Sequence, residues 1–161
     1  MKAIAAVDEN WAIGSQGKLL CPISADLKRF KVITTGHPVI LGRKTLATFP
    51  GGRPLPGREN LILSATMTDA PEGAKVFGNL DALLAYAPDD AIVIGGESVY
   101  QALLPYCDKV YITKIHASFP ADCWFPDLDR DPTWQVADRE GPLEENGVKF
   151  SYWTYRWRDI S

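Results

Sequence analysis

Short apolar runs, separated by amphipathic and polar stretches, dominate the pattern of this chain. The first run lies at Lys2–Val7, and similar runs recur at 38–41, 61–63, 75–77 and 92–94. A short segment that is apolar throughout is typical of a strand buried on both faces of a sheet. We therefore expect these runs to be strands of one buried sheet.

Helices are predicted between these strands. Ser24 can accept a hydrogen bond from the first turn of a helix over 25–34, and Gly36 would end that helix. Further helices are expected over 42–48, over 79–87 with Asn79 as the cap, and from 97 onward. The polar segment 8–20 and the turn-rich segment 49–60 are expected to be loops.

The last third of the chain has a different pattern. Val110–Ile115 alternates only partly between apolar and polar positions, and we expect a strand there. The segments 134–137 and 149–157 indicate two long antiparallel strands around a Gly-Pro and Asn-Gly loop. The whole pattern predicts an α/β fold, with a predominantly parallel twisted sheet, flanking helices and a C-terminal antiparallel hairpin.

Composition favours a single globular domain over residues 1–161. Hydrophobic residues make up 46% and charged residues 23% of the chain, which argues against disorder and allows a substantial core. No internal repeat interrupts this picture. The formal net charge of −3 argues against nucleic acid or an anionic membrane as the main partner.

Cysteine use and the N-terminal pattern favour a cytoplasmic protein. Cys21, Cys107 and Cys123 are widely spaced without a CxxC pair, so neither a disulfide framework nor a metal site is expected. The first apolar run stops at Asp8, which makes it too short for a signal peptide. No apolar stretch approaches the length of a membrane span.

Three strand ends carry residues suited to phosphate. In AIVIGGESVYQALL a buried strand runs through Gly95-Gly96 into a helix, whose unpaired N–H groups suit an anion. The segment GRKT, from Gly42, adds two cations and a hydroxyl, and SAT, from Ser64, adds further hydroxyls. Each of these segments, taken alone, is also explained by a tight turn or by solvated surface charges. Because ligands of open α/β sheets bind at the carboxyl ends of strands, their convergence predicts a nucleotide site.

Asp26 lies on the apolar face of the predicted helix 25–34. The spacing of Asp26, Phe30 and Ile33 places them on one face, where a carboxylate is costly to bury without a partner. Asp26 either complements the helix dipole or binds a ligand that carries N–H donors. Arg58, which ends the proline-rich stretch RPLPGR, is either a carboxylate clamp or an exposed loop arginine.

Longer blocks of the sequence resemble a known family. GxGxxG, Walker P-loop and GxSxG motifs are absent, which excludes the standard dinucleotide fingerprint, NTPase and α/β-hydrolase. The chain instead resembles the dihydrofolate reductases through AAVDENWAIG, DLKRFK, PVILGRKT, GRPLPGREN-LILS, VIGGESVY, VYITKI, DCWFPD and an aromatic closing strand. These blocks cover essentially the whole chain in the family's order. The resemblance implies reduction of dihydrofolate to tetrahydrofolate by NADPH, binding of antifolate-type molecules, and a monomer.

The resemblance implies roles for individual residues on the substrate side. Asp26 matches the carboxylate that anchors the pterin and favours protonation of its imine nitrogen, and Thr113 would support it. Arg58 matches the arginine that binds the α-carboxylate of the substrate. The other implied substrate contacts are Ala6, Leu27, Phe30, Phe49, Leu55 and Ile94.

The same resemblance implies that the three strand ends hold NADPH. Arg43 and Ser64 suit the 2′-phosphate, which favours NADPH over NADH. A cis peptide bond is implied between Gly95 and Gly96. The implied cofactor contacts are Ala5, Ile13, Gly14, Leu19, Gly42, Arg43, Lys44, Thr45, Ser64, Ala65, Ile94, Gly95, Gly96, Glu97, Ser98, Val99 and Tyr100.

The segment before Asp26 departs from the family pattern. Cys21 stands where the family has a tryptophan, and Leu20 and Ser24 stand where it has prolines. Because cysteine is smaller and a weak donor, we expect Cys21 to alter the catalytic site, its turnover or its antifolate sensitivity. The segment 11–20 is the expected lid. Two alternatives stay open: a reductase for another pterin-like substrate, and a folate- or NADPH-binding paralogue with weak activity.

Overall fold

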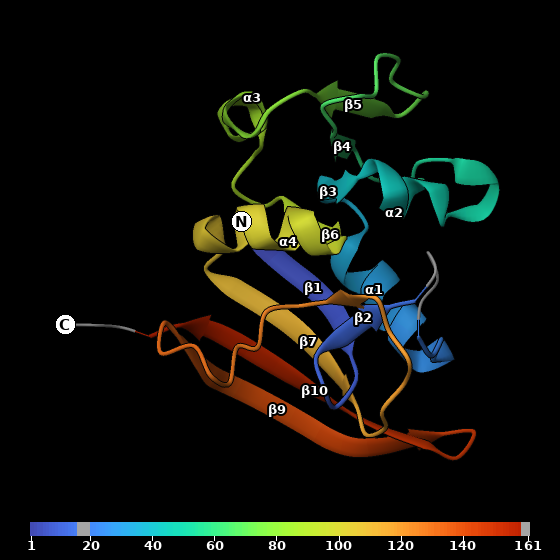
Figure 1. Ribbon diagram of the computed structural model, residues 1–161, viewed down its shortest axis with the longest axis vertical. Coiled ribbons are helices and arrows are strands. Elements are labelled where there is room, and N and C mark those ends of the chain that lie inside the picture. Colours follow the sequence, from blue (N-terminus) through green and yellow to red (C-terminus); the bar gives the residue numbers. More distant parts are fainter. Residues whose placement is uncertain (16–19, 159–161) are drawn as a thin grey trace.

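An eight-stranded sheet forms the centre of the protein (Figure 1). The computed structural model describes residues 1–15 and 20–158. The strands follow the order β5-β4-β3-β6-β1-β7-β10-β9 across the sheet. Their bounds are Lys2–Val7 (β1), Val39–Gly42 (β3), Asn60–Leu63 (β4), Ala74–Phe77 (β5), Ile92–Gly95 (β6), Lys109–Ile115 (β7), Trp134–Glu145 (β9) and Val148–Trp157 (β10).

The pairing of these strands confirms the predicted fold class. β1 lies between β6 and β7 and is parallel to both. The strands β3, β4 and β5 continue the parallel order on the side of β6. β10 is antiparallel to β7 and to β9, so the C-terminal hairpin forms one edge of the sheet.

Helices cover both faces of the sheet. They are α1 (Ser24–Thr34), α2 (Arg43–Ala47), α3 (Leu80–Tyr86) and α4 (Glu97–Leu103), with 3-10 turns η1 (Pro50–Gly52) and η2 (Leu104–Tyr106). Side chains of α1 and α2, such as Phe30 and Leu46, pack into the apolar cluster on one face. Side chains of α3 and α4, such as Leu83 and Val99, pack into the cluster on the other. The successive apolar residues of each strand supply both clusters, because they point to alternate faces.

The predicted loop 8–20 contains a short strand. β2 (Ala12–Gly14) pairs with β8 (Cys123–Trp124) in a separate two-stranded sheet. The carboxylate of Asp8, which is 2% exposed, accepts the backbone N–H of Asn10 before β2, that of Ala12 at the start of β2, and that of Phe119 before β8. The sequence pattern missed β2 because so short a strand shows no measurable alternation.

The C-terminal hairpin is longer than predicted. β9 runs through Gly141-Pro142, where a loop was expected, and ends at Glu145. The register against β10 shifts opposite this dipeptide, and such an irregularity accommodates a proline without ending the strand. The turn consists of Asn146 and Gly147, with φ of 51° and 80°, as Asn-Gly favours in a two-residue hairpin.

The start of α1 also differs from the prediction. Ser24 is the first residue inside the helix, and Ile23 precedes it as an extended N-cap without a capping side chain. The carboxylate of Glu145, from the end of β9, accepts the backbone N–H groups of Ser24 and Ala25 instead. The local sequence could not reveal a cap that comes from another strand. Asn79, by contrast, caps α3 as predicted.

Three further features concern the part of the chain that the structure describes. Within residues 1–15 and 20–158, no helix combines the length and the apolar character required to cross a membrane. In the same residues, no group of three or more His, Cys, Asp or Glu side chains is arranged to hold a metal ion. Cys21, Cys107 and Cys123 are free thiols.

Candidate active site

A hydrogen bond joins the first turn of α1 to the centre of the sheet. Thr113, on β7 and 2% exposed, donates from Oγ1 to Oδ1 of Asp26 at 2.5 Å. Burial raises the pKa of Asp26, while this hydrogen bond and the charge of Arg29 act in the opposite direction. The nearby helix N–H groups are bonded to Glu145, not to Asp26. This geometry favours a ligand-binding carboxylate over one that only complements the helix dipole.

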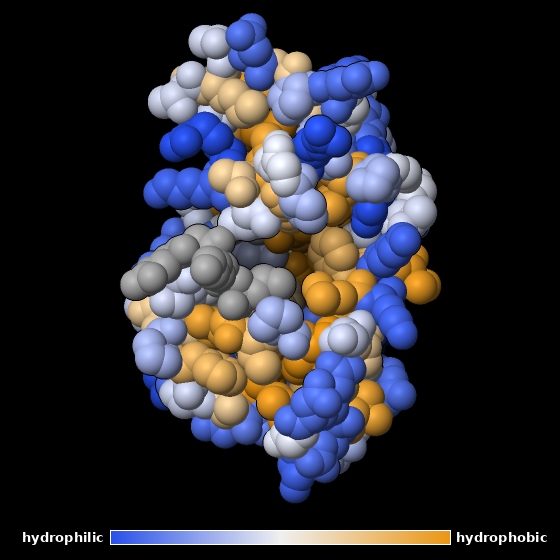
Figure 2. Space-filling model, turned by 90° about the vertical axis from the view of Figure 1, so that its right-hand side faces the viewer, coloured by the Kyte–Doolittle hydropathy of each residue, from blue (hydrophilic) through white to orange (hydrophobic). Residues whose placement is uncertain are grey.

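Four of the predicted substrate contacts share one apolar cluster on the α1 side of the sheet, namely Phe30, Phe49, Leu55 and Ile94. Figure 2 shows a hollow on the side of the molecule that carries α1 and α2, with apolar side chains along its wall. Phe30, Phe49 and Leu55 are only half-buried, so part of each side chain stays accessible. A flat aromatic molecule would find apolar contacts here.

The loop between η1 and β4 brings a cation to the far end of α1. Arg58 donates from Nη1 to Oγ1 of Thr34 at 2.9 Å and from Nε to the carbonyl oxygen of Pro56 at 2.9 Å. The guanidinium therefore has a fixed place against α1, as a carboxylate clamp requires. Arg53, by contrast, is exposed on the same loop.

The three predicted phosphate-binding strand ends lie at one edge of the sheet. β4, β3 and β6 are parallel neighbours, so that Gly42 is level with Leu63, and Leu41 is level with Gly95. Ser64 follows β4 directly, and its Oγ accepts the backbone N–H of the turn beyond it at 3.1 Å. The carboxyl ends of three strands are thus level with one another, as the sequence predicted.

The ends of β3 and β6 lie close together, because α2, which follows β3, packs against the Gly95-Gly96 turn at the end of β6. A Cβ atom at Gly95 or at Gly96 would lie 3.3 Å from Oγ1 of Thr45. The peptide groups of the turn therefore lie next to the hydroxyl, and a larger side chain would force Thr45 to move. The Gly95-Gly96 peptide bond is cis, as the resemblance implies. Arg43 and Lys44 are exposed at the start of α2, beside this hydroxyl.

The remaining predicted residues are divided between the two faces of the sheet. Cys21 and Ala6 are half-buried and pack against the apolar cluster that includes Tyr152. Ala5 and Ile13 pack against the cluster on the opposite face, which includes Val99 and Tyr100. Ala5 and Ala6 are adjacent in sequence, but they pack against different clusters on opposite faces of the sheet.

Several predicted cofactor and substrate residues lie apart from these clusters. The side chains of Leu27, Ala65 and Ser98 are exposed. Glu97, at the start of α4, accepts the backbone N–H of Trp124 at 2.7 Å and so ties α4 to β8. Gly14 closes the pairing of β2 with β8, so the first part of the expected lid is held by a strand. Leu19 lies outside the described residues.

Comparison with known proteins identifies the family. Residues 1–157 match the family model for dihydrofolate reductase. The chain is 35% identical over 161 residues to the dihydrofolate reductase of Bacillus subtilis (strain 168), covering 98% of this chain and 95% of that one. The chain belongs to the dihydrofolate reductase family.

Other members of the dihydrofolate reductase family are similarly close. Dihydrofolate reductase type 3 of Salmonella typhimurium is 41% identical over 138 residues, which cover 84% of this chain and 83% of that one. A solved structure of dihydrofolate reductase from Enterococcus faecalis, complexed with NADP(H) and RAB-propyl, matches with a TM-score of 0.87 at 35% identity. That match covers 98% of this chain and 96% of the other.

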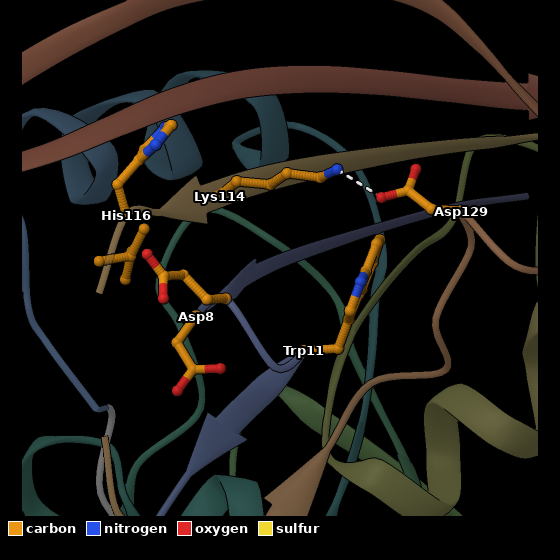
Figure 3. Close-up of a pocket in the computed structure, with 7 residues that line it drawn as sticks. Asp8, Trp11, Lys114, His116 and Asp129 are labelled. Atoms are coloured by element: carbon orange, nitrogen blue, oxygen red, sulfur yellow. Dashed lines mark hydrogen bonds and ion pairs between the residues drawn. The ribbon is translucent and has the colours of Figure 1, made fainter. Parts of the chain in front are cut away.

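In this dihydrofolate reductase family member, β7 contributes side chains to sites on both faces of the sheet. Lys114, next to Thr113, forms an ion pair with Asp129 at 2.7 Å and lies 5.2 Å from the ring centre of Trp11. Figure 3 shows these side chains around a pocket of about 140 Å³, whose wall also includes Asp8 and His116. Because adjacent residues of a strand point to opposite faces, this pocket is separate from the site that Thr113 faces.

Asn60 is a positioning residue that the sequence analysis missed. Its side chain is 0% exposed, and Oδ1 accepts the backbone N–H of Leu55 at 2.9 Å. Its Nδ2 donates to the carbonyl oxygens of Leu55 and Arg58, each at 2.9 Å. Asn60 thereby ties two predicted substrate contacts to the start of β4. The available signal was an asparagine at the start of a fully apolar strand, in REN-LILS.

Replacing Asn60 by alanine is expected to destabilise the fold by about 1–3 kcal/mol, because partly buried backbone groups of Leu55 and Arg58 lose their partner. Urea unfolding measures this change, and hydrogen exchange at the Leu55 amide reports whether the loop has loosened. Asn79→Ala is the matched control, since it removes the cap of α3 and leaves the Leu55 exchange rate unchanged. An unchanged Leu55 exchange rate in Asn60→Ala would contradict the positioning role.

Proposed function

We propose that the chain reduces 7,8-dihydrofolate to 5,6,7,8-tetrahydrofolate with NADPH, with Asp26, Thr113 and Arg58 on the substrate side. As a member of its family the chain is an NADPH-dependent oxidoreductase, which supplies tetrahydrofolate for one-carbon metabolism. The observation that carries the assignment of residues is the hydrogen bond from Thr113 to Asp26, made within a site of raised carboxyl pKa.

Asp26 is the proposed catalytic residue. A pterin presents a ring N–H and an amino group side by side, and a carboxylate can accept hydrogen bonds from both. Thr113 fixes the orientation of this carboxylate and is a positioning residue. The negative charge of Asp26 favours protonation of the imine nitrogen of the bound ring. Phe30 and Phe49 offer apolar contacts to the pterin and benzoyl rings.

The ends of β3, β4 and β6 fit the phosphates of NADPH. The Gly95-Gly96 turn carries no side chains, and a Cβ at either position would lie only 3.3 Å from Oγ1 of Thr45, so its peptide groups can approach a phosphate closely. Arg43 and Lys44 supply exposed positive charge beside it, and Arg43 with Ser64 suits the 2′-phosphate. When bound, NADPH supplies the hydride. The chain's part is to align the two ligands and to exclude water between them.

Arg58 separates this function from the reduction of other pterin-like molecules. Dihydrofolate carries a glutamyl tail with an α-carboxylate, and a guanidinium can bind a carboxylate through two parallel hydrogen bonds. The contacts of Arg58 with Thr34 and Pro56 leave other N–H groups of its guanidinium available for such a pair. A substrate without the tail would gain nothing from this arginine.

Loss of NADPH absorbance after addition of dihydrofolate to the purified protein tests the proposal. We expect rapid loss with dihydrofolate, and a kcat/KM about tenfold or more lower with a dihydropterin that lacks the glutamyl tail, since a hydrogen bond between charged groups contributes about 1.5–3 kcal/mol. Equal kcat/KM values for the two substrates would favour a reductase for another pterin. NADPH binding without turnover would favour the weakly active paralogue, and either result would overturn the proposal.

We further propose that the chain acts as a cytoplasmic monomer with no nucleic-acid partner, and that residues 1–161 form one domain. The three free cysteines are compatible with a reducing compartment. The net charge of −3 does not favour binding to nucleic acid. The half-buried thiol of Cys21, just before α1, remains the feature we expect to alter turnover or antifolate sensitivity.

A further inference from the structure

The first turn of α1 is capped by a side chain from the C-terminal hairpin. The N–H groups at the start of a helix have no partner within the helix. Oε2 of Glu145 accepts the N–H of Ser24 at 2.7 Å, and Oε1 accepts the N–H of Ala25 at 3.1 Å. One carboxylate thus satisfies two of these groups from a position 121 residues further along the chain. Asp26 is the next residue of the helix.

The same hairpin contacts α1 again on the other side of Asp26. The guanidinium carbon of Arg29 lies 4.1 Å from the ring centre of Tyr152 on β10. Tyr152 is the register partner of Thr113, the residue that donates to Asp26. Figure 1 shows the turn of the hairpin on the same side of the molecule as α1. The hairpin therefore touches the helix just before and just after the carboxylate.

Apolar burial anchors this turn of the helix only at the residue before it, since Ile23 is 3% exposed in the cluster that includes Tyr152. Ser24 and Ala25 are exposed, and Leu27 is 47% exposed. Thr34, at the opposite end, is the fully buried residue of α1. After the buried Ile23, the residues of this turn bury little apolar area, so polar contacts such as the Glu145 cap add to the hold on its position.

We propose that Glu145 is a positioning residue for the substrate, which holds the first turn of α1, and with it Asp26, in place. The inference rests on the proposed role of Asp26. A carboxylate at this end of a helix also complements the helix dipole, which adds to the two hydrogen bonds. The cap requires an N–H at position 24, which Ser24 supplies.

Three variants of the full chain test this role. Glu145→Ala removes both acceptors, and Glu145→Gln keeps one. Ser24→Pro removes one donor without breaking the helix, since proline is favoured at the first helical position and the extended Ile23 can precede it. We expect KM for dihydrofolate to rise roughly ten- to a hundredfold in Glu145→Ala, less in the other two, because misplacement of a binding group by about 1 Å costs that much. KM for NADPH should stay unchanged.

Hydrogen exchange separates this proposal from the proposed function. Hydrogen exchange at the Ala25 and Leu27 amides needs no turnover, and we expect it to become faster in Glu145→Ala. Glu144→Gln is the matched control, because it removes a neighbouring exposed charge without touching α1, and it should behave as the unmodified chain. If the unmodified chain does not reduce dihydrofolate, the proposed function fails, and hydrogen exchange still tests the cap.

The proposal is overturned by either of two results. The first is unchanged exchange at Ala25 and Leu27 in Glu145→Ala. The second is an equal rise of KM for dihydrofolate and for NADPH, which indicates general loss of structure and no selective effect on the substrate. In the combined variant, Ser24→Pro should add almost nothing to Glu145→Ala, because both changes remove the same contact.

Discussion

Asp26→Asn is expected to lower kcat/KM for dihydrofolate by about 10²- to 10⁴-fold at neutral pH, the range that general acid–base groups contribute. Asparagine has nearly the same shape and can still accept a hydrogen bond from Thr113, so the change removes charge and leaves packing intact. Without that charge, protonation of the substrate depends on the pH of the solvent. The loss should therefore shrink as the pH falls, which steady-state assays of NADPH absorbance across a pH series measure.

Thr113→Val is the matched variant, because it keeps the carboxylate and removes only the hydrogen bond. That hydrogen bond lowers the pKa of Asp26, so its removal should raise this pKa and move the pH dependence of kcat/KM upward. A value of kcat/KM in Asp26→Asn equal to that of the unmodified chain at neutral pH would exclude Asp26 from catalysis.

Asp26→Asn should also make the fold more stable at neutral pH. Burial holds the pKa of Asp26 above its ordinary value of 3.8, so as the pH rises from that value the unfolded chain releases its proton first. As the pH rises, the free energy of unfolding of the unmodified chain therefore falls until the pH passes the raised pKa of Asp26. The asparagine variant has no such loss, because asparagine does not titrate. Asp26→Asn should therefore have the higher Tm at pH 7, with the gain fading below about pH 4. Thermal unfolding across this range checks the sign.

Gly95→Ala is expected to have the second largest effect, on both stability and cofactor binding. Gly95 has a φ of +137°, which L residues rarely adopt, and holding another residue there costs about 1–3 kcal/mol. The new Cβ would also lie 3.3 Å from Oγ1 of Thr45, a tight contact that the Thr45 side chain has to relieve by moving a few tenths of an ångström. We expect a lower Tm and a Kd for NADPH at least roughly tenfold higher, since each 1.4 kcal/mol is a factor of ten.

Gly96→Ala separates backbone strain from contact. Its Cβ would lie at the same 3.3 Å from Thr45, but its φ of −94° is open to alanine. Gly96→Ala should therefore lose less stability than Gly95→Ala, and the additional change Thr45→Ala should relieve only the contact. Fluorescence titration with NADPH and thermal unfolding give both quantities. An NADPH Kd unchanged in Gly95→Ala would remove this turn from the cofactor site.

The sequence predicted the elements whose signal is local. β1 and β6 are continuous apolar runs, and the cap at Asn79 precedes its helix directly, so each could be recognised from a few neighbouring residues. The level ends of β3, β4 and β6 were also predictable, because parallel strands end at one edge of a sheet. Local chemistry and the general geometry of parallel sheets were sufficient here.

Contacts between distant segments could not be predicted in this way. The pattern around Asp26 left two explanations open, and only the fold shows that Thr113, 87 residues away, donates to it. Glu145 and Asn60 are polar residues whose partners are backbone groups, and backbone groups carry no sequence signal. Ser24 was wrongly predicted as the cap because a suitable local residue was present, whereas Ser24 lies inside the helix and a distant carboxylate accepts the first two N–H groups.

The helix α1 has a consequence for the size of molecule that fits. Its first turn carries Asp26, and at its last turn Thr34 holds the guanidinium of Arg58. A helix advances 1.5 Å per residue, so these two positions are about 12 Å apart along its axis. In the proposed binding mode, the helix therefore fixes the distance between the residues that bind the head and the tail of the ligand. A molecule much shorter than dihydrofolate can satisfy one end or the other, and inserting a residue into α1 would change the length that satisfies both.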